Sequence, residues 1–203
     1  MFVITLILIA LSSNSQAFGE FEVGAQLGLN GSYISPVNNE NSNFLISYNT
    51  GISGEYYFTD IWGLKMKLIY DKKGWSNAII ADGNFNPKKA DLIFDYITLP
   101  VMVNWHFGYE KNWYVNFGFY VGFLMSVKDS ASSSPFDLKE GFRDIDFGGT
   151  FGLGYKFNID KNIMLFFEIQ GQSGLLGVFK DEDDEYLPLT RSSINAGILF
   201  HIR

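Results

Sequence analysis

Apolar and polar residues alternate with a period of two along most of this chain. Successive side chains of a β-strand point to opposite faces, so this spacing is typical of strands whose two faces differ. Eight segments show it, at residues 21–30, 44–58, 62–71, 97–107, 113–125, 145–157, 163–172 and 191–202. We find no convincing helical period. The pattern therefore predicts an all-β chain.

The connections between these segments alternate in length. Long ones are predicted at 35–43, 72–92, 127–142 and 173–189, and short turns at 59–60, 108–112 and 158–162. An even strand count with short periplasmic turns and longer extracellular loops is the layout of bacterial outer-membrane barrels. We predict an eight-stranded antiparallel up-and-down transmembrane β-barrel, with both chain ends on the periplasmic side and a localisation in the cell outer membrane.

The size of the apolar face indicates that it points outward. It carries more than forty side chains, many of them aromatic, whereas the interior of an eight-stranded barrel is only just wide enough for side chains to fill. A soluble ligand-carrying barrel would need this face inside, and a soluble sandwich should expose Thr, Lys and Glu rather than glycine on the other face. The opposite face instead holds Gly24, Gly28, Gly51, Gly118, Gly122, Gly148, Gly152 and Gly154.

Composition fits this arrangement and excludes several classes of protein. Aromatic residues make up 17% of the 203 residues and charged residues only 18%, below the usual quarter or so of charged residues. No apolar run is long enough for a membrane-spanning helix. The absence of cysteine removes disulfides and thiolate chemistry. A net charge of -7 argues against nucleic acid as a partner, because binding it needs cationic side chains on phosphates.

The N-terminus resembles a secretory signal peptide. Residues 2–11 are apolar apart from Thr5, and the small residues Ser15 and Ala17 stand at the −3 and −1 positions of a cleavage site. The usual Lys or Arg before the apolar stretch is missing. A short buried strand or helix, or a start assigned too far downstream, is the alternative. We predict a signal peptide at residues 1–17 and an outer-membrane β-barrel domain at residues 18–203.

Aromatic residues gather beside the short turns. Three of the four tryptophans lie there on the apolar face, and amphipathic rings favour the headgroup zone of a membrane. This predicts an aromatic girdle at the periplasmic end. Its members are Phe58, Trp62, Trp105, Phe107, Trp113, Tyr155 and Phe157.

Charged residues on the opposite face predict a polar network in the lumen. Charges in so narrow a space must be paired or hydrated. The plainer interpretation is a structural plug of salt bridges and water, and the alternative is a gated ion path between Lys65, Lys67 and Glu168. The predicted network comprises Glu22, Glu55, Lys65, Lys67, Asp95, Asp146, Lys156, Glu168 and Arg191; Asp144 is a further candidate.

The sequence offers little for catalysis or for a metal ion. His106 and His201 both fall near the periplasmic ends of their strands, away from the outer rim where a lipid-modifying enzyme would act. We predict no catalytic residues, no cofactor and no metal site. The acidic run at 181–185 lacks the register of a Ca²⁺ loop and is more simply a solvated loop, although divalent bridging to lipopolysaccharide phosphates is an alternative.

One long connection is itself apolar. Trp75, Ile79, Ile80 and Phe85 lie in the predicted 72–92 loop. Apolar groups on such a loop either pack over the barrel mouth or contact a partner. We expect packing, and this loop is where a protein partner would be sought first.

The segment from Asp95 to Val103, with the sequence DYITLPVMV, resembles the Tyr-x-x-Ile/Leu-Pro strand of PorT-like outer-membrane β-barrel proteins of Bacteroidota. The resemblance implies an eight-stranded outer-membrane barrel. Most such proteins have no assigned function, and the named member's role in assembling a secretion system does not transfer on so short a motif. Such chains often end in an aromatic residue, whereas this one ends in Phe200-His201-Ile202-Arg203, so insertion would rely on Phe200 and Ile202. Pro100 lacks an N–H group, which predicts a bulge or an edge-like break there.

Together these features predict a non-enzymatic, monomeric outer-membrane barrel with a filled polar lumen. It would act structurally or through its extracellular loops, as an adhesion or assembly partner. The expected partners are outer-membrane lipid and a possible protein at those loops. A narrow ion or solute channel is the runner-up, and a lipid-modifying barrel enzyme is less favoured.

Overall fold

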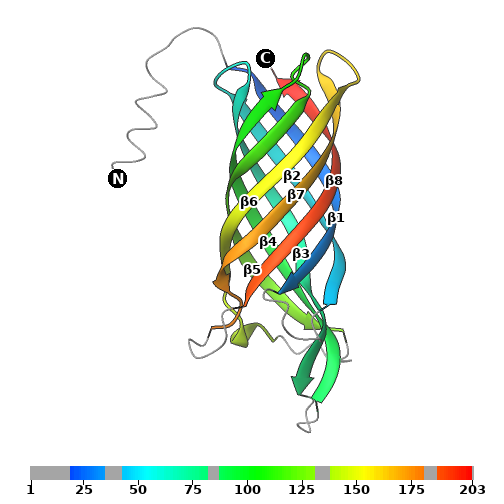
Figure 1. The fold of residues 1–203 in the computed structure, drawn as a ribbon, viewed down its shortest axis with the longest axis vertical. Helices are drawn as coiled ribbons and strands as arrows, with labels where there is room; N and C mark the ends of the chain where they lie inside the picture. Colours follow the sequence, from blue (N-terminus) through cyan, green and yellow to red (C-terminus); the bar gives the residue numbers. More distant parts are fainter. Residues whose placement is uncertain (1–18, 35–42, 82–86, 131–137, 181–186, 203) are drawn as a thin grey trace, which may run out of the picture.

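The computed structural model shows a single closed barrel with strongly tilted strands (Figure 1). It describes residues 19–34, 43–81, 87–130, 138–180 and 187–202. The predicted signal peptide, the acidic run at 181–185 and Phe85 lie outside the described residues. The strands are β1 (Phe21–Ile34), β2 (Asn43–Tyr57), β3 (Trp62–Ala81), β4 (Pro87–Phe107), β5 (Trp113–Asp129), β6 (Ile145–Asn158), β7 (Ile163–Gly177) and β8 (Pro188–Ile202).

The strands follow one another around the barrel in chain order, and every neighbouring pair is antiparallel. Pairing of β1 with β8, from Phe21↔Ile202 to Ile34↔Leu189, closes the sheet and leaves no edge. This confirms the predicted fold. A 3₁₀ turn, η1 (Leu138–Gly141), lies between β5 and β6. Among the described residues, no helix is long and apolar enough to cross a membrane.

The two ends of the barrel differ. The three short turns, the start of β1 and the end of β8 lie at one end of the barrel, which we call the short-turn end (Figure 1). The longer connections lie at the other, the long-loop end. There the β3–β4 hairpin projects beyond the rest of the barrel.

The strands at the long-loop end are longer than the sequence pattern predicts. β3 and β4 take in most of the predicted 72–92 connection, and β7 and β8 shorten the predicted 173–189 connection. The register shifts between Trp75 and Ala78 in the β3–β4 ladder and between Asp95 and Tyr96 in the β4–β5 ladder. Such bulges break the period of two without ending the strand, so a count based on alternation stops too early.

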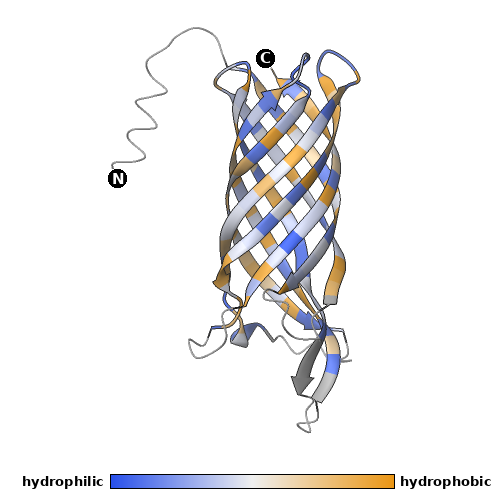
Figure 2. Ribbon diagram, viewed as in Figure 1, coloured by the Kyte–Doolittle hydropathy of each residue, from blue (hydrophilic) through white to orange (hydrophobic). Residues whose placement is uncertain are grey.

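The apolar face points outward, as predicted. Leu27 is 69% exposed and Ile46 is 73% exposed, although both lie in the middle of paired strands. Figure 2 shows hydrophobic and hydrophilic residues alternating along the ribbons around the whole barrel. An apolar outer face on a closed, edge-free sheet is what a bilayer requires of a β-sheet that spans it.

Pro100 interrupts one ladder without a bulge. Pro100 pairs with Tyr120 of β5, but it is not paired with any residue of β3 in the β3–β4 ladder. The register is the same on both sides of the gap, with Met66↔Val101 before it and Ile69↔Thr98 after it. Of the two alternatives predicted at Pro100, the edge-like break in the ladder is confirmed and the bulge is wrong. The missing proline N–H accounts for the gap.

An apolar cluster closes the interior at the long-loop end. We call it the apolar cap, and its buried members are Ile34, Trp75, Leu92, Phe94, Tyr96, Leu124, Val127, Phe142, Val178 and Leu189. Phe94 stacks on Trp75 at 5.3 Å between ring centroids and meets Phe142 edge-on at 4.9 Å. Trp75 thus packs in the barrel mouth, as expected for the apolar residues of this predicted connection. The side chains of Ile79 and Ile80 lie outside the described part of the structure.

Candidate functional site

The barrel interior holds a balanced set of buried charges. None of them exposes more than 6% of its surface, and isolated buried charges are very costly unless paired. The five inward-facing carboxylates are those of Glu22, Glu55, Asp71, Asp146 and Glu168, and the five cations are Lys65, Lys67, Lys73, Lys156 and Arg191. Asp95 is also only 3% exposed, but it has the outward parity of β4. The equal numbers allow every buried charge a partner of opposite sign.

Glu55 is the centre of the group nearest the short-turn end. One of its oxygens accepts from Asn104 Nδ2 at 2.7 Å and lies 2.7 Å from His106 Nε2. The other oxygen is 3.6 Å from Lys156 Nζ. Lys156 Nζ in turn donates to Glu22 at 2.6 Å. Four strands are linked by these contacts, because Glu22, Glu55, His106 and Lys156 come from β1, β2, β4 and β6.

Glu168 of β7 is the centre of the middle group. It accepts from Lys67 Nζ, from Tyr114 Oη at 3.1 Å and from Asn116 Nδ2 at 2.9 Å. Lys65 Nζ lies 3.7 Å from the same carboxylate and 4.5 Å from the centre of the Tyr114 ring. The alternative ion path was predicted between these two lysines and Glu168, but the structure shows the three held in direct ion pairs.

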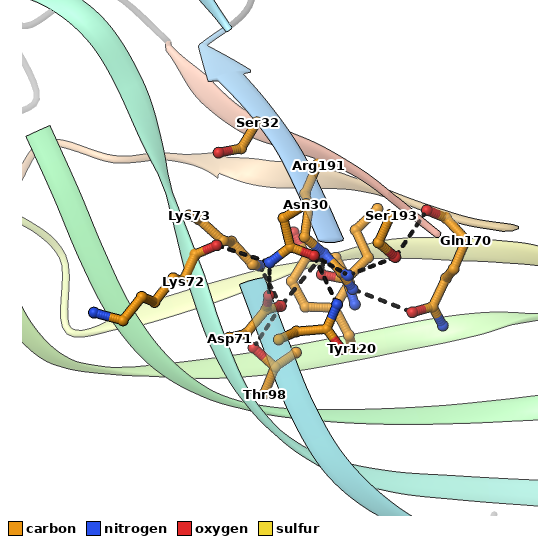
Figure 3. A network of polar contacts seen from close by, with 12 residues as sticks. Asn30, Ser32, Asp71, Lys72, Lys73, Thr98, Tyr120, Gln170, Arg191 and Ser193 are labelled. Carbon is orange, nitrogen blue, oxygen red and sulfur yellow. Dashed lines mark hydrogen bonds and ion pairs between the residues drawn. The ribbon is translucent and has the colours of Figure 1, made fainter. Parts of the chain in front are cut away.

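Arg191 of β8 organises the group nearest the apolar cap (Figure 3). It is fully buried, and its guanidinium donates to Asn30, Gln170, Gln172 and Ser193 at 2.8–3.3 Å. Its Nε lies 3.3 Å from Asp71 Oδ2. Nε, Nη1 and Nη2 all have partners, which satisfies the donor fork of arginine in a fixed geometry.

Two charged residues of the group nearest the apolar cap, Asp71 and Lys73, are absent from the predicted network. Lys73 Nζ is 3.0 Å from Asp146 Oδ2 and 3.9 Å from Asp71 Oδ2. It also lies over the rings of Tyr120 and Tyr96. Asp71 and Lys73 share the parity of Lys65 and Lys67 along β3. Asp71 is the last residue of the predicted strand, and extending the alternation by two residues would have found Lys73.

The predicted lumen network is wrong about Asp95, which does not face the interior. Eight of its nine residues lie inside the barrel, but Asp95 pairs with Lys72 and Ser126, and its charged partner Lys128 has a side chain that is 61% exposed. Its neighbour Tyr96 is the residue that faces inward. Asp95 has the parity of the outward residue Ile97, so strict alternation places it outside. Asp144 is also not internal: it precedes β6, is 57% exposed and contacts Lys139 and Lys180.

The seven predicted girdle residues lie at the short-turn end, and six of them join one row of contacting rings. Trp62 stacks on Trp105, which stacks on Phe107 at 5.0 Å between centroids. The row continues through Trp113, Tyr155 and Phe157 to Phe167, with centroid distances of 4.6–6.4 Å. Phe58, in the first short turn, is 41% exposed. The sequence places these rings beside the short turns, but it does not show that they contact one another across five strands.

A water-accessible cavity of about 300 Å³ opens at the short-turn end. Glu22, Tyr57, His106 and Lys156 form its inner wall, and turn residues including Asp60 form its rim. His106 is 3% exposed and hydrogen-bonded to Glu55. His201 lies 3.6 Å from Glu20 at the same end. Both imidazoles therefore belong to the short-turn mouth.

A closed antiparallel eight-stranded sheet with an apolar exterior, an aromatic row at one end and a filled ionic interior defines an outer-membrane β-barrel. The chain belongs to the family described as outer membrane protein beta-barrel domain, which matches residues 12–180.

Solved structures show the same architecture. Neisserial surface protein A (NspA) aligns with a TM-score of 0.55 and 13% identity, covering 89% of this chain and 96% of its own. OprG from Pseudomonas aeruginosa aligns with a TM-score of 0.56 and 11% identity, covering 91% and 96%. AlkL, solved in lipid bilayers, has a TM-score of 0.54 and 10% identity, covering 94% of each chain. These likenesses to solved structures establish the fold. Among curated protein sequences none matches this chain.

Proposed function

We propose that this protein is a non-enzymatic, monomeric barrel that does not conduct and that acts at its long-loop end as an adhesion or assembly partner. The observation that carries the proposal is the interior itself: ion pairs fill its middle and the apolar cap closes its outer end. A solute would have to separate buried ion pairs and then cross an apolar constriction, which excludes ions by dewetting.

The long-loop end offers a fixed surface. The segments before β6 and after β7 are joined by an isolated bridge between Phe142 and Phe179. Arg143 N–H donates to Val178 O at 2.9 Å, and Arg143 Nε donates to Phe179 O at 2.7 Å. The two segments are thereby held as one surface at the apolar cap, to which Phe142 and Val178 belong. Such a fixed surface suits presentation of a binding face. The Tyr96-to-Pro100 motif supports a PorT-like subfamily, but so short a motif does not favour an assembly role over an adhesive one.

Planar-bilayer recordings are expected to show no unitary conductance for the wild-type protein in KCl at either polarity. The reason is that both the ion network and the apolar cap must open before an ion can pass. Steady conductance whose cation selectivity changes in Lys67→Gln, but not in the short-turn control Lys111→Gln, would contradict the proposal and establish the narrow channel instead.

A photo-crosslinking residue in place of Lys180 is expected to give discrete adducts with another outer-membrane protein in native membranes. Lys180 is exposed beside the joined loops. The matched control replaces Lys161, exposed in the last short turn. Adducts formed only after a second cell surface is added would favour adhesion. The loop-end role is wrong if Lys180 gives no specific adduct under either condition, or if Lys161 gives the same ones.

A further inference from the structure

A charged cluster interrupts the apolar outer face of the barrel on β3–β5. It consists of Lys72, Asp95 and Lys128, with Tyr48 and Tyr70 beside it. Figure 3 shows the Lys72 side chain turned away from the interior network. On the outward faces of β2–β5, these are the first charged residues met on moving from the aromatic row toward the long-loop end.

Asp95 holds the two lysines side by side. Lys72 Nζ lies 3.1 Å from one carboxylate oxygen and Lys128 Nζ lies 3.1 Å from the other. Ser126 Oγ donates to the same carboxylate at 2.9 Å. Lys72 Nζ also lies over the rings of Tyr48 and Tyr70, at 5.5 and 5.9 Å. The cluster carries a net charge of +1.

The lysines keep free donor capacity. Each ammonium has three N–H groups, and Asp95 takes one from each. The Lys128 side chain is 61% exposed and that of Lys72 21%, so their remaining donors can reach a ligand from the membrane side. An oxyanion with several acceptor oxygens would meet both ammonium groups at once.

The cluster lies at the outer boundary of the bilayer. Trp62 and Lys72 are ten residues apart on β3. At about 3.3 Å per residue and a tilt of about 40°, that separation is about 25 Å along the membrane normal, equal to the apolar band of such barrels. The aromatic row marks one interface, so Lys72 marks the other, where lipid headgroups lie and where Lys and Tyr anchor proteins.

We propose that Lys72 and Lys128 bind the phosphate of an anionic outer-leaflet lipid, with Asp95 as the positioning residue and the tyrosine rings packing beside the headgroup. This site is independent of the proposed role of the loops, because it needs only the barrel's place in the membrane. A phosphorylated glycolipid fits best, since its headgroup phosphate and acyl chains match a cationic pair above an apolar wall.

Native mass spectrometry of the folded full-length protein, titrated in detergent with a bis-phosphorylated lipid A, provides the test. Each lysine near an anionic lipid contributes about fivefold in affinity. The double variant Lys72→Gln/Lys128→Gln is therefore expected to weaken binding at least about tenfold. The control Lys111→Gln/Lys161→Gln removes the same charge at the short-turn end and should bind like wild type.

The dephosphorylated glycolipid should bind the wild-type protein as weakly as lipid A binds the double variant. Equal binding of lipid A to wild type and double variant, or equal loss in the control, would overturn the proposal. Equal binding of the dephosphorylated lipid would show an acyl-chain contact instead. If the double variant fails to fold, Lys128→Gln alone, which removes a largely exposed side chain, should still weaken binding about threefold or more, and no change would be decisive against the site.

Discussion

Replacing Glu168 with glutamine is expected to lower the free energy of unfolding by about 3–5 kcal/mol, the usual cost of breaking a buried ion pair from one side. Lys67, Tyr114 and Asn116 all donate to this carboxylate. Lys65 has a second carboxylate, Glu55, only at 4.0 Å. A neutral amide would leave an excess positive charge in the interior and would turn an NH₂ group toward groups that are themselves donors.

The measurement is denaturant unfolding of protein folded into phospholipid vesicles, followed by tryptophan emission. Glu140→Gln removes the same charge from an exposed turn and should leave the transition unchanged. Lys67→Met combined with Glu168→Leu removes one acid and one base and is expected to be more stable than Glu168→Gln alone, because the interior keeps equal numbers of positive and negative charges. A loss below about 1 kcal/mol in Glu168→Gln would contradict the pairing described here.

Gly148→Val and Gly149→Val are expected to have opposite outcomes although the residues are neighbours on β6. A Cβ at Gly148 would lie 2.1 Å from Ser173 O and 2.8 Å from the Tyr120 ring. Relief would require β7 to move away from β6, since Gly148 pairs with Gly174 in that ladder. A Cβ at Gly149 meets nothing within 4 Å, because that position faces outward.

Gly148→Val should therefore cost about 3 kcal/mol or more, and little of the protein should reach the folded form. Gly149→Val should fold like wild type. The measurement is the folded fraction after dilution into lipid vesicles, read as the heat-modifiable band on unboiled gels. A normal folded fraction for Gly148→Val, or an equal loss in both variants, would show that close approach of the strands does not set the need for glycine here.

The fold was predictable because the alternation of apolar and polar residues can be read along each strand, and the total size of the apolar face then decides which way it points. More than forty apolar side chains on one face cannot fit inside eight strands, so the direction of that face followed from volume alone. The same rule correctly placed Leu27 and Ile46 outside. It failed where a bulge adds a residue, near Trp75 in β3 and between Leu124 and Ser126 in β5, because alternation carries no information about the partner strand.

The interior was only partly predictable. Parity placed Glu55, Lys65 and Glu168 on the inner face, but Glu168 of β7 is far along the chain from β2 and β3, which carry the other two. Which acid meets which base depends on the register and tilt of all eight strands, and the sequence states neither. The apolar cap depends on the same closure, because Trp75 of β3 and Phe94 of β4 meet Phe142, which lies just before β6, only in the closed barrel.

The sequence by itself determined the strand count, the outward apolar face and the aromatic level at the short turns, since these depend on period and composition. Tertiary structure decided the pairing of the buried charges, the closure of the long-loop end and the contacts of Asp95 with Lys72 and Lys128. The physical reason is that charge pairing and closure depend on distances between strands, which the register of the closed sheet sets.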